Sequence, residues 1–332
     1  MTAVLLGLLA SACFSVTFIV NRAIGVAGGH WVWTATLRYA WVLLMLGAWF
    51  GIRGRLPAVL EAFRREWRFW VVAGSVGYGI FYTGLAYAST LAPGWVVACT
   101  MQATILATPL VLRWFGARVR LHGLALLGLI FFGIVLVNLE HRDESGVGRL
   151  SAVLPVLVAA FAFPVGSQLL QEARNGGRGW IPRLDDAVTA DAAARVLLMT
   201  LGSVPYWGLV LLVPHPTVPS SGQVAGAAIV ALLATVVGSS IFLQARNSVG
   251  RDANRIAVVD ATQAAYTVFS LGGEVAFLGA VLPGPLGVVG LLLVVGGLAA
   301  YAWSGTRVPA RSVTPPGGPT RVPAESGRHA GR

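Results

Sequence analysis

The chain has 332 residues, of which 56% are hydrophobic and only 11% are charged, and its mean hydropathy is +0.74. A soluble globular domain carries about 25% charged residues, so this composition excludes that class and predicts a polytopic membrane protein. The net charge of +11 comes from arginines spread among short segments between apolar runs. That pattern indicates membrane topology, and we expect no nucleic-acid partner.

No metal site and no cofactor are expected. Cys13 and Cys99 lie within apolar runs and lack CxxC spacing, which argues against a disulfide framework and against a zinc site. The five histidines are scattered along the chain, and no two of them stand at a spacing typical of metal ligands.

The first apolar run, residues 2–20, resembles a signal peptide in length. It has no basic segment before it, and Ala10-Ser11-Ala12-Cys13 is a poor lipoprotein cleavage site because no leucine stands three positions before the cysteine. We therefore expect residues 2–20 to form the first transmembrane helix.

Nine further runs of about 20 apolar residues follow, each long enough to cross the roughly 30 Å hydrocarbon core of a bilayer as a helix. The ten expected spans are 2–20, 31–50, 69–90, 94–112, 121–139, 151–170, 192–213, 223–243, 256–277 and 285–303. Residues 304–332 are rich in Pro, Gly and Arg, and we expect them to form a disordered cytoplasmic tail.

The distribution of arginine predicts the orientation of these spans. Nineteen of the 24 arginines lie in the even-numbered connections and the tail, whereas the odd-numbered connections contain only three. Because arginine-rich connections stay on the cytoplasmic side, we expect a multi-pass protein of the inner (plasma) membrane with both termini in the cytoplasm. The alternation also favours ten spans, since the loss of one helix would disrupt it.

Five spans in each half imply that the two halves insert in opposite directions, and traces of a duplication are visible. Residues 101–104 (Met-Gln-Ala-Thr) align with residues 262–265 (Thr-Gln-Ala-Ala), and Arg38 and Arg195 occupy the corresponding second and seventh spans. We therefore predict an all-α fold of two inverted five-helix repeats, residues 1–139 and 150–303. Such repeats are typical of secondary transporters whose site lies near the bilayer midplane.

The ninth span, residues 256–277, carries the strongest candidate site. Five of its polar residues are spaced by three and four positions, so on a helix these five share one face. They are Asp260, Gln263, Thr267, Ser270 and Glu274. An ionisable group at membrane depth normally faces protein or a water-filled cavity, so we expect this face to line a translocation cavity, with Asp260 as proton or cation acceptor and Gln263 as a substrate partner. In the alternative, the two acids at its ends reach headgroup water.

Three residues of the first half are further candidates. Gln102 lies on the symmetry-related fourth span and either completes the same cavity or joins two helices. Arg38 lies about seven residues inside its span and either binds an anionic substrate group, pairs with Glu274 or extends to the headgroups. Trp95 is either an interfacial residue or a surface on which substrate stacks.

Arg195 is interpreted differently, as a topology anchor. It stands at the start of the seventh span, four residues after Asp191, and this spacing favours a local ion pair between the two side chains.

Short motifs throughout the chain resemble a known family. Pro109, Leu278-Gly279, Pro285, Gly290 and Gly297 look like the two five-helix repeats of the drug/metabolite transporter superfamily. Within it, the chain resembles the putative multidrug resistance efflux transporter family at Thr17-Phe18 to Asn21-Arg22, Trp31-Val32-Trp33, Leu37-Arg38-Tyr39, Pro93-Gly94-Trp95, Thr100-Met101-Gln102, Gly202-Ser203-Val204-Pro205 and Asp260-Ala261-Thr262-Gln263.

The resemblance implies export of a small molecule, a drug or metabolite, by alternating access driven by a proton or counter-substrate gradient. The small four-helix exporters of the superfamily use a glutamate in their first helix, but residues 2–20 and 151–170 contain no acid. Ala280 also replaces the glutamate that usually follows Leu278-Gly279. If protons are coupled, Asp260 or Glu274 must carry them.

The sequence also bears on two functions other than export. A lipid or lipid-linked headgroup flippase of the same fold is not separable from an exporter by sequence. A membrane-embedded lipid enzyme is not expected, because the one acidic doublet, Asp185-Asp186, lacks the flanking acids of a diphosphate-metal motif. The expected partners are a small-molecule substrate, a proton or counter-substrate, and membrane lipid. One chain with two complete halves suffices as a monomer, and a homodimer stays open.

Overall fold

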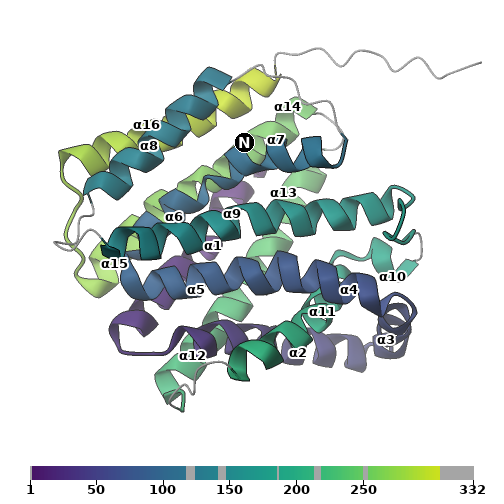
Figure 1. Cartoon of the computed structure of the whole chain (residues 1–332). Helices are drawn as coiled ribbons and strands as arrows, with labels where there is room; N and C mark the ends of the chain where they lie inside the picture. The colour runs from purple at the N-terminus through teal and green to yellow at the C-terminus, as the bar shows by residue number, and fades with distance from the viewer. Residues whose placement is uncertain are drawn as a thin grey trace, which may run out of the picture.

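The computed structural model describes residues 2–116, 124–140, 147–184, 187–212, 218–249 and 253–306. Every named element in this part of the chain is helical (Figure 1), and its single isolated bridge joins Arg178 to Ile181. The prediction of an all-α fold is thereby confirmed. The doublet Asp185-Asp186 and most of the predicted tail, residues 307–332, lie outside the described residues.

The first half of the chain forms one helix after another. Its elements are α1 (Thr2–Val26), α2 (Trp31–Ile52), α3 (Leu56–Arg65), α4 (Trp67–Gly74), η1 (Ser75–Ile80), α5 (Phe81–Leu91), α6 (Gly94–Met101), α7 (Thr104–Trp114) and α8 (Leu124–Glu140). α4, η1 and α5 follow each other without a break and form one rod, in which η1 is a π-helical segment.

The second half has the same character. Its elements are α9 (Val147–Arg174), α10 (Ala187–Ala190), α11 (Ala192–Leu212), α12 (Ser221–Val230), η2 (Ala231–Gly238), α13 (Ser239–Ser248), α14 (Ala253–Ala261), η3 (Thr262–Ala264), α15 (Ala265–Leu278) and α16 (Pro285–Thr306). α12, η2 and α13 form a second rod with a π-helical segment in its middle.

Seven of the described helices are long and apolar enough to cross a membrane. They are Thr2–Val26, Trp31–Ile52, Trp67–Leu91, Gly94–Trp114, Ser151–Arg174, Ala192–Leu212 and Ser221–Ser248. Two shorter apolar helices, Ala125–Glu140 and Pro285–Tyr301, correspond to the fifth and tenth expected spans. The ninth expected span is divided among α14, η3 and α15. The chain is therefore a multi-pass membrane protein.

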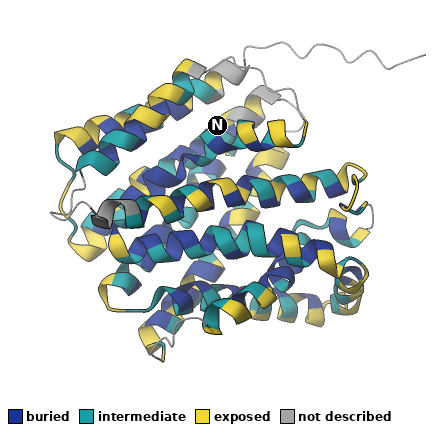
Figure 2. Cartoon of the chain, in the orientation of Figure 1, coloured by how far each residue is buried: buried dark blue, intermediate teal, exposed yellow. Residues whose placement is uncertain are grey.

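The outer surface of the bundle is apolar, as contact with a bilayer requires. Large apolar side chains point outward from helices all around the molecule, among them Leu5, Leu44, Leu212 and Leu292. Figure 2 shows exposed residues along the outer sides of the helices and buried residues where helices face each other. Exposed apolar area of this extent indicates contact with lipid.

Two of the helical rods change their winding at related places. α6 ends at Met101 and α7 begins at Thr104, so Gln102 and Ala103 interrupt the fourth expected span. In the ninth, the 3₁₀ segment η3 covers Thr262–Ala264. Ser11 on α1 donates a hydrogen bond to the Thr262 carbonyl oxygen at 2.8 Å, which satisfies a backbone acceptor where regular α-helical bonding is disturbed.

The helices that carry the site lie across the middle of the bundle. α1 packs against η2, α13 and α15, and α6 packs against α15 and α9. α8 and α16 pair along one edge, at the top of Figure 1, and α2 and α12 pair near the opposite edge. The central position of α1, α6 and α15 brings together residues that are far apart in sequence, such as Ser11 and Thr262, which are separated by 251 positions.

Candidate functional site

A cavity of about 520 Å³ opens where α1 and α15 end and α6 begins. Three ionisable side chains and one tryptophan line it, together with apolar residues of the connection between α15 and α16. The lining residues are Arg22, Ala23, Val26, Ala27, Pro93, Trp95, Glu140, Glu274, Leu278, Ala280, Val281, Leu282 and Pro283. We call this space the Glu274 cavity.

Glu274 is the most deeply buried of the charged groups in this cavity. It is 1% exposed, and its Oε1 accepts a hydrogen bond from the Gly94 amide at 2.5 Å. Gly94 is the first residue of α6, so the carboxylate lies where a helix presents unpaired N–H groups and the positive end of its dipole. These contacts offset part of the cost of removing a carboxylate from water.

Gly94 allows this close approach because it has no side chain. A Cβ atom at this position would collide with the Glu274 carboxylate and with the Phe18 carbonyl oxygen of α1. The Pro93-Gly94-Trp95 motif therefore has a physical reason. Glycine lets α1, α6 and α15 meet at one point, and Trp95, which is 5% exposed, contributes to the wall of the cavity.

The second carboxylate of the cavity, Glu140, occupies an equivalent position at another helix. It is the last residue of α8, and its Oε1 accepts a hydrogen bond from the Gly284 amide at 2.6 Å. Its Oε2 accepts a further bond from the Gly287 amide, in the first turn of α16. Both acids of the Glu274 cavity are thus held by backbone donors at the start of a helix.

Arg22 supplies the positive charge of the cavity and connects α1 to α5. Its Nη1 donates to the carbonyl oxygens of Ser89 at 3.3 Å and Thr90 at 3.2 Å. These are carbonyls of the last turn of α5, where a cation is favoured by the helix dipole. Arg22 is also among the charged neighbours of Glu274.

Deeper on α15, the predicted polar face is buried against the first half. The Gln102 Nε2 donates to the Thr267 Oγ1 at 3.2 Å, and the two residues are 4% and 0% exposed. Ser270 is also fully buried, and its hydroxyl has no hydrogen-bond partner in the part of the chain that the structure describes. Gln102 thus joins the interruption between α6 and α7 to the ninth expected span.

Asp260 lies apart from this group. Its Oδ1 is 3.2 Å from the Arg246 Nε of α13, and both side chains are more than two-fifths exposed. Gln263 lies in η3 and is half-buried, and its side chain makes no hydrogen bond to another described residue. The structure therefore separates the predicted polar face into a buried part, Thr267 to Glu274, and a half-buried end at Asp260, because η3 alters the helical repeat between them.

Arg38 lies between helices of both halves. Its Nη2 donates to the Thr235 Oγ1 of η2 at 3.0 Å, and its guanidinium carbon is 4.1 Å from the centre of the Tyr82 ring. The side chain points inward toward these partners and not toward Glu274, whose hydrogen bond comes from Gly94. The expected pairing of Arg38 with Glu274 is therefore not present in this structure.

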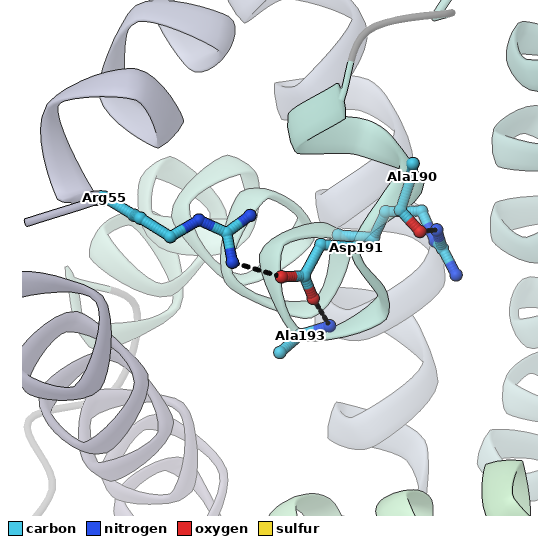
Figure 3. Close-up of polar contacts among 5 residues, drawn as sticks. Arg55, Ala190, Asp191 and Ala193 are labelled. Atoms are coloured by element: carbon cyan, nitrogen blue, oxygen red, sulfur yellow. Dashed lines mark hydrogen bonds and ion pairs between the residues drawn. The ribbon is translucent and has the colours of Figure 1, made fainter. Parts of the chain in front are cut away.

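The expected ion pair between Arg195 and Asp191 is wrong. The Asp191 Oδ2 instead accepts from the Arg55 Nη1 at 2.9 Å, and its Oδ1 accepts from the Ala193 amide at 2.9 Å (Figure 3). Arg195 donates to the carbonyl oxygens of Thr189 and Ala190, both at 2.8 Å. Asp191 precedes α11 and caps its first turn, so its carboxylate points away from the position four residues later.

Sequence reasoning missed Arg22 and Glu140 as cavity residues. Arg22 was counted only as a loop arginine, and Glu140 stands one residue after the expected fifth span. An acid directly at the end of an apolar run is a signal that marks Glu140 for attention. No local pattern, however, shows that it reaches the start of α16, 144 positions later.

Comparisons with known proteins agree with this architecture. The family model described as "Putative multidrug resistance efflux transporter" (EmrE) matches residues 1–307. The chain is 32% identical over 322 residues to "Uncharacterized protein YjlA" of Bacillus subtilis (strain 168), covering 92% of this chain and 95% of the relative. It is also 32% identical over 275 residues to an uncharacterized 42.1 kDa protein of Shouchella clausii, covering 79% and 69%.

One solved structure, described only as "Crystal structure of protein", shares the fold. It superposes with a TM-score of 0.57 at 19% identity and covers 90% of this chain and 96% of its own. The family match spans nearly all of the membrane region described above. The chain therefore belongs to the putative multidrug resistance efflux transporter family, a family of small-molecule transporters.

Proposed function

We propose that this protein is a secondary active transporter that exports a small molecule by alternating access. We further propose that its ten helical segments all cross the inner membrane as two inverted five-helix repeats, with both termini in the cytoplasm. Family membership supports small-molecule transport. The coupling ion, the direction and the repeat are our own inferences from residues and contacts.

The placement of helix irregularities supports the repeat. The interruption after Met101 and the 3₁₀ segment that begins at Thr262 fall on the two stretches that align in sequence, and α7 and α15 begin at the aligned positions 104 and 265. The π-helical segments η1 and η2 likewise lie in the third and eighth expected spans. Irregularities at equivalent positions are more economically explained by duplication than by chance.

Helix pairing supports it as well. α1 packs against η2 and α13 just as α9 packs against η1 and α5, and α1 packs against α15 just as α9 packs against α6 and α7. One set of contacts breaks this relation. α1 also packs against α5 and α6, whereas α9 has no comparable contact with η2, α13 or α15 in the described part of the chain. One of two alternating states would show such an asymmetry.

We assign the role of proton acceptor to Glu274. It is buried between the halves, lines the cavity and bonds to the first residue of α6, and this is the observation that carries the proposal. A charged carboxylate at this point holds α15 against the start of α6. A proton arriving from the cavity would remove that charge and weaken the contact, so that α1 and α15 separate from α6. Asp260, half-buried and paired with Arg246, lacks this connection.

Proton coupling can be tested with the full-length protein in liposomes that contain a trapped pH-sensitive dye. Ethidium, a permanent cation, and benzenesulfonate, a permanent anion, serve as first test solutes. Wild-type vesicles are expected to move protons when at least one of these solutes is added, Glu274→Gln is expected to abolish this flux, and Asp260→Asn is expected to retain it. Elution volume and melting temperature verify that both variants are folded. Wild-type proton flux in Glu274→Gln would reject the assigned role.

A further inference from the structure

A polar cluster around Tyr82 lies at the junction of four helical rods. Tyr82 is fully buried on α5, and its hydroxyl donates to the Asn21 Oδ1 of α1 at 3.0 Å. The guanidinium of Arg38, from α2, lies over the same ring, and Thr235 of η2 accepts a hydrogen bond from it. We call Asn21, Arg38, Tyr82 and Thr235 the Arg38 cluster. It brings together elements from both halves of the chain.

The positive charge of Arg38 is not balanced by an acidic residue on any of the four rods that carry the cluster. The sequence contains no Asp or Glu in residues 2–60, 67–139 or 192–251, and these ranges include all four rods. The ionisable groups that act on Arg38 are three tyrosines, Tyr39, Tyr78 and Tyr82. A guanidinium at membrane depth normally pairs with an acid or faces a functional space. Here an acid is lacking in every rod that surrounds it.

Two donors of the cluster are unpaired. The Arg38 Nε and the Asn21 Nδ2 are each buried without a hydrogen-bond partner among the described residues, and Asn21 is only 2% exposed. A buried donor left unpaired costs about 1 to 3 kcal/mol. Native structures rarely accept that cost without a reason such as a bound ligand. One of these donors belongs to the guanidinium, and the other belongs to a residue that contacts the same tyrosine. An anionic oxygen acceptor would satisfy both donors and balance the positive charge.

The surroundings indicate what accompanies the anionic group. The Tyr39 ring stacks on Tyr78 at 5.4 Å and on Trp207 at 5.2 Å, and it meets Tyr82 edge to face at 5.7 Å. One face of the guanidinium is covered by Tyr82 and its Nη2 donates to Thr235, so the side that carries the unpaired Nε is the one that a carboxylate would approach. Aromatic walls near that side suit an apolar or aromatic body.

From these observations we infer that the transported molecule carries an anionic group, a carboxylate or phosphate, on a small apolar or aromatic body, and that Arg38 and Asn21 bind that group. This inference rests on the proposed transport function and names its substrate class. It also separates the roles of the two sites. The Arg38 cluster recognises the anion, whereas Glu274 carries the proton, so that a proton and an organic anion use different residues.

The test uses two sets of probes matched in size. One is benzoate, benzamide and benzylamine, and the other is indole-3-acetate, indole-3-acetamide and tryptamine. Binding to the purified full-length protein is measured by the rise in melting temperature with probe concentration, and transport by counterflow in proteoliposomes. In at least one set, the carboxylate is expected to bind at least about ten-fold more tightly than its amide or amine, as for a charge-assisted hydrogen bond.

Three variants test the assignment to residues. Arg38→Gln is expected to weaken binding of the preferred carboxylate at least about ten-fold, and Arg38→Lys to weaken it less, because a charge remains without the forked guanidinium. Asn21→Asp, which is isosteric, places a carboxylate beside Arg38. It is expected to raise the melting temperature while abolishing carboxylate binding. A purely structural role of Arg38 would lower the melting temperature in Arg38→Gln without altering the preference among probes.

Anionic lipid is the other source of the same chemistry. Scrambling of fluorescent phosphatidylglycerol in the same vesicles, lost in Arg38→Gln, would support recognition of an anionic group from lipid. The inference is overturned if neither set shows a preference for the carboxylate and no Arg38-dependent scrambling occurs, or if Arg38→Gln retains the preference. Coupled ethidium transport in that case would leave the proposed function intact, whereas transport of no solute at all would reject both.

Discussion

Glu274 and Glu140 show how single residues make buried charge tolerable in a membrane protein. Each carboxylate accepts backbone N–H groups at the first turn of a helix that belongs to a different part of the chain. The dipole of that helix and the unpaired amides replace water as the solvating medium. Arg22 also lines the cavity, and it donates hydrogen bonds to carbonyls at the end of α5, where the negative end of the helix dipole stabilises a cation. The cavity is thus lined by charges that helix ends stabilise.

The close approach at Gly94 makes a prediction about stability. In Gly94→Ala, the new methyl group would collide with the Glu274 carboxylate and the Phe18 carbonyl, and we expect a loss of about 1 to 3 kcal/mol of unfolding free energy. Gly272→Ala is the matched control, because it lies on α15 and its Cβ would meet open space. Denaturant titration of the purified protein measures both. An unchanged Gly94→Ala protein would show that the helices do not meet there as described.

At the scale of elements, the important feature is that the fourth and ninth expected spans are both interrupted near their middles. The Gln102–Thr267 hydrogen bond joins α15 to the interruption between α6 and α7, and Ser11 joins α1 to η3. Interrupted helices present backbone and side-chain polar groups inside a membrane only where protein or a cavity surrounds them. These interruptions therefore belong at the interface of the two halves.

We predict that the Gln102–Thr267 hydrogen bond makes a measurable contribution to the free energy of unfolding. Thr267→Val removes the acceptor of a buried Gln102 amide and is expected to cost about 1 kcal/mol. Thr267→Ser keeps the hydroxyl and serves as the control. Unfolding in mixed micelles compares the two, and equal stability of the valine and serine variants would show that the bond contributes nothing to folding.

At the scale of the whole molecule, the charged side chains of the cavity and of the ion pairs fall into two groups, one on each side of the membrane in the predicted topology. Arg22, Glu140 and Glu274 gather around one cavity, which lies where the predicted topology has helices end or begin on the outer face. The pair Arg55–Asp191 joins two connections that the same topology places in the cytoplasm, and the pair Arg246–Asp260 joins α13 to α14 near the cytoplasmic end of the ninth expected span. Side-chain pairing between distant segments is therefore consistent with the orientation expected from arginine alone.

The orientation can be measured by cysteine labelling in a background that carries Cys13→Ala and Cys99→Ala. Val281→Cys, on the exposed connection before α16, is expected to react with a membrane-impermeant maleimide in intact cells. Arg64→Cys, exposed on α3, is expected to react only after the cells are opened. The opposite labelling pattern would show that the orientation is the reverse of the predicted one, and protons from the cavity would then reach Glu274 from the cytoplasmic side.

The sequence by itself determined the membrane class, the helical fold, the family and the approximate position of each helix. Hydropathy and arginine distribution are local properties, and a bilayer converts them directly into helices. The polar face of the ninth span was also visible, because a helical period relates residues three and four positions apart.

Only the tertiary structure decided which of these residues meet. It paired Asp191 with Arg55 instead of Arg195, Arg38 with Thr235 and Tyr82 instead of Glu274, and Glu140 with the start of α16. It also divided the ninth span, so that Asp260 lies apart from Glu274. The physical reason is that these partners lie on different elements, and their meeting depends on how helices pack and where helical winding is interrupted. Neither property is encoded in a local repeat.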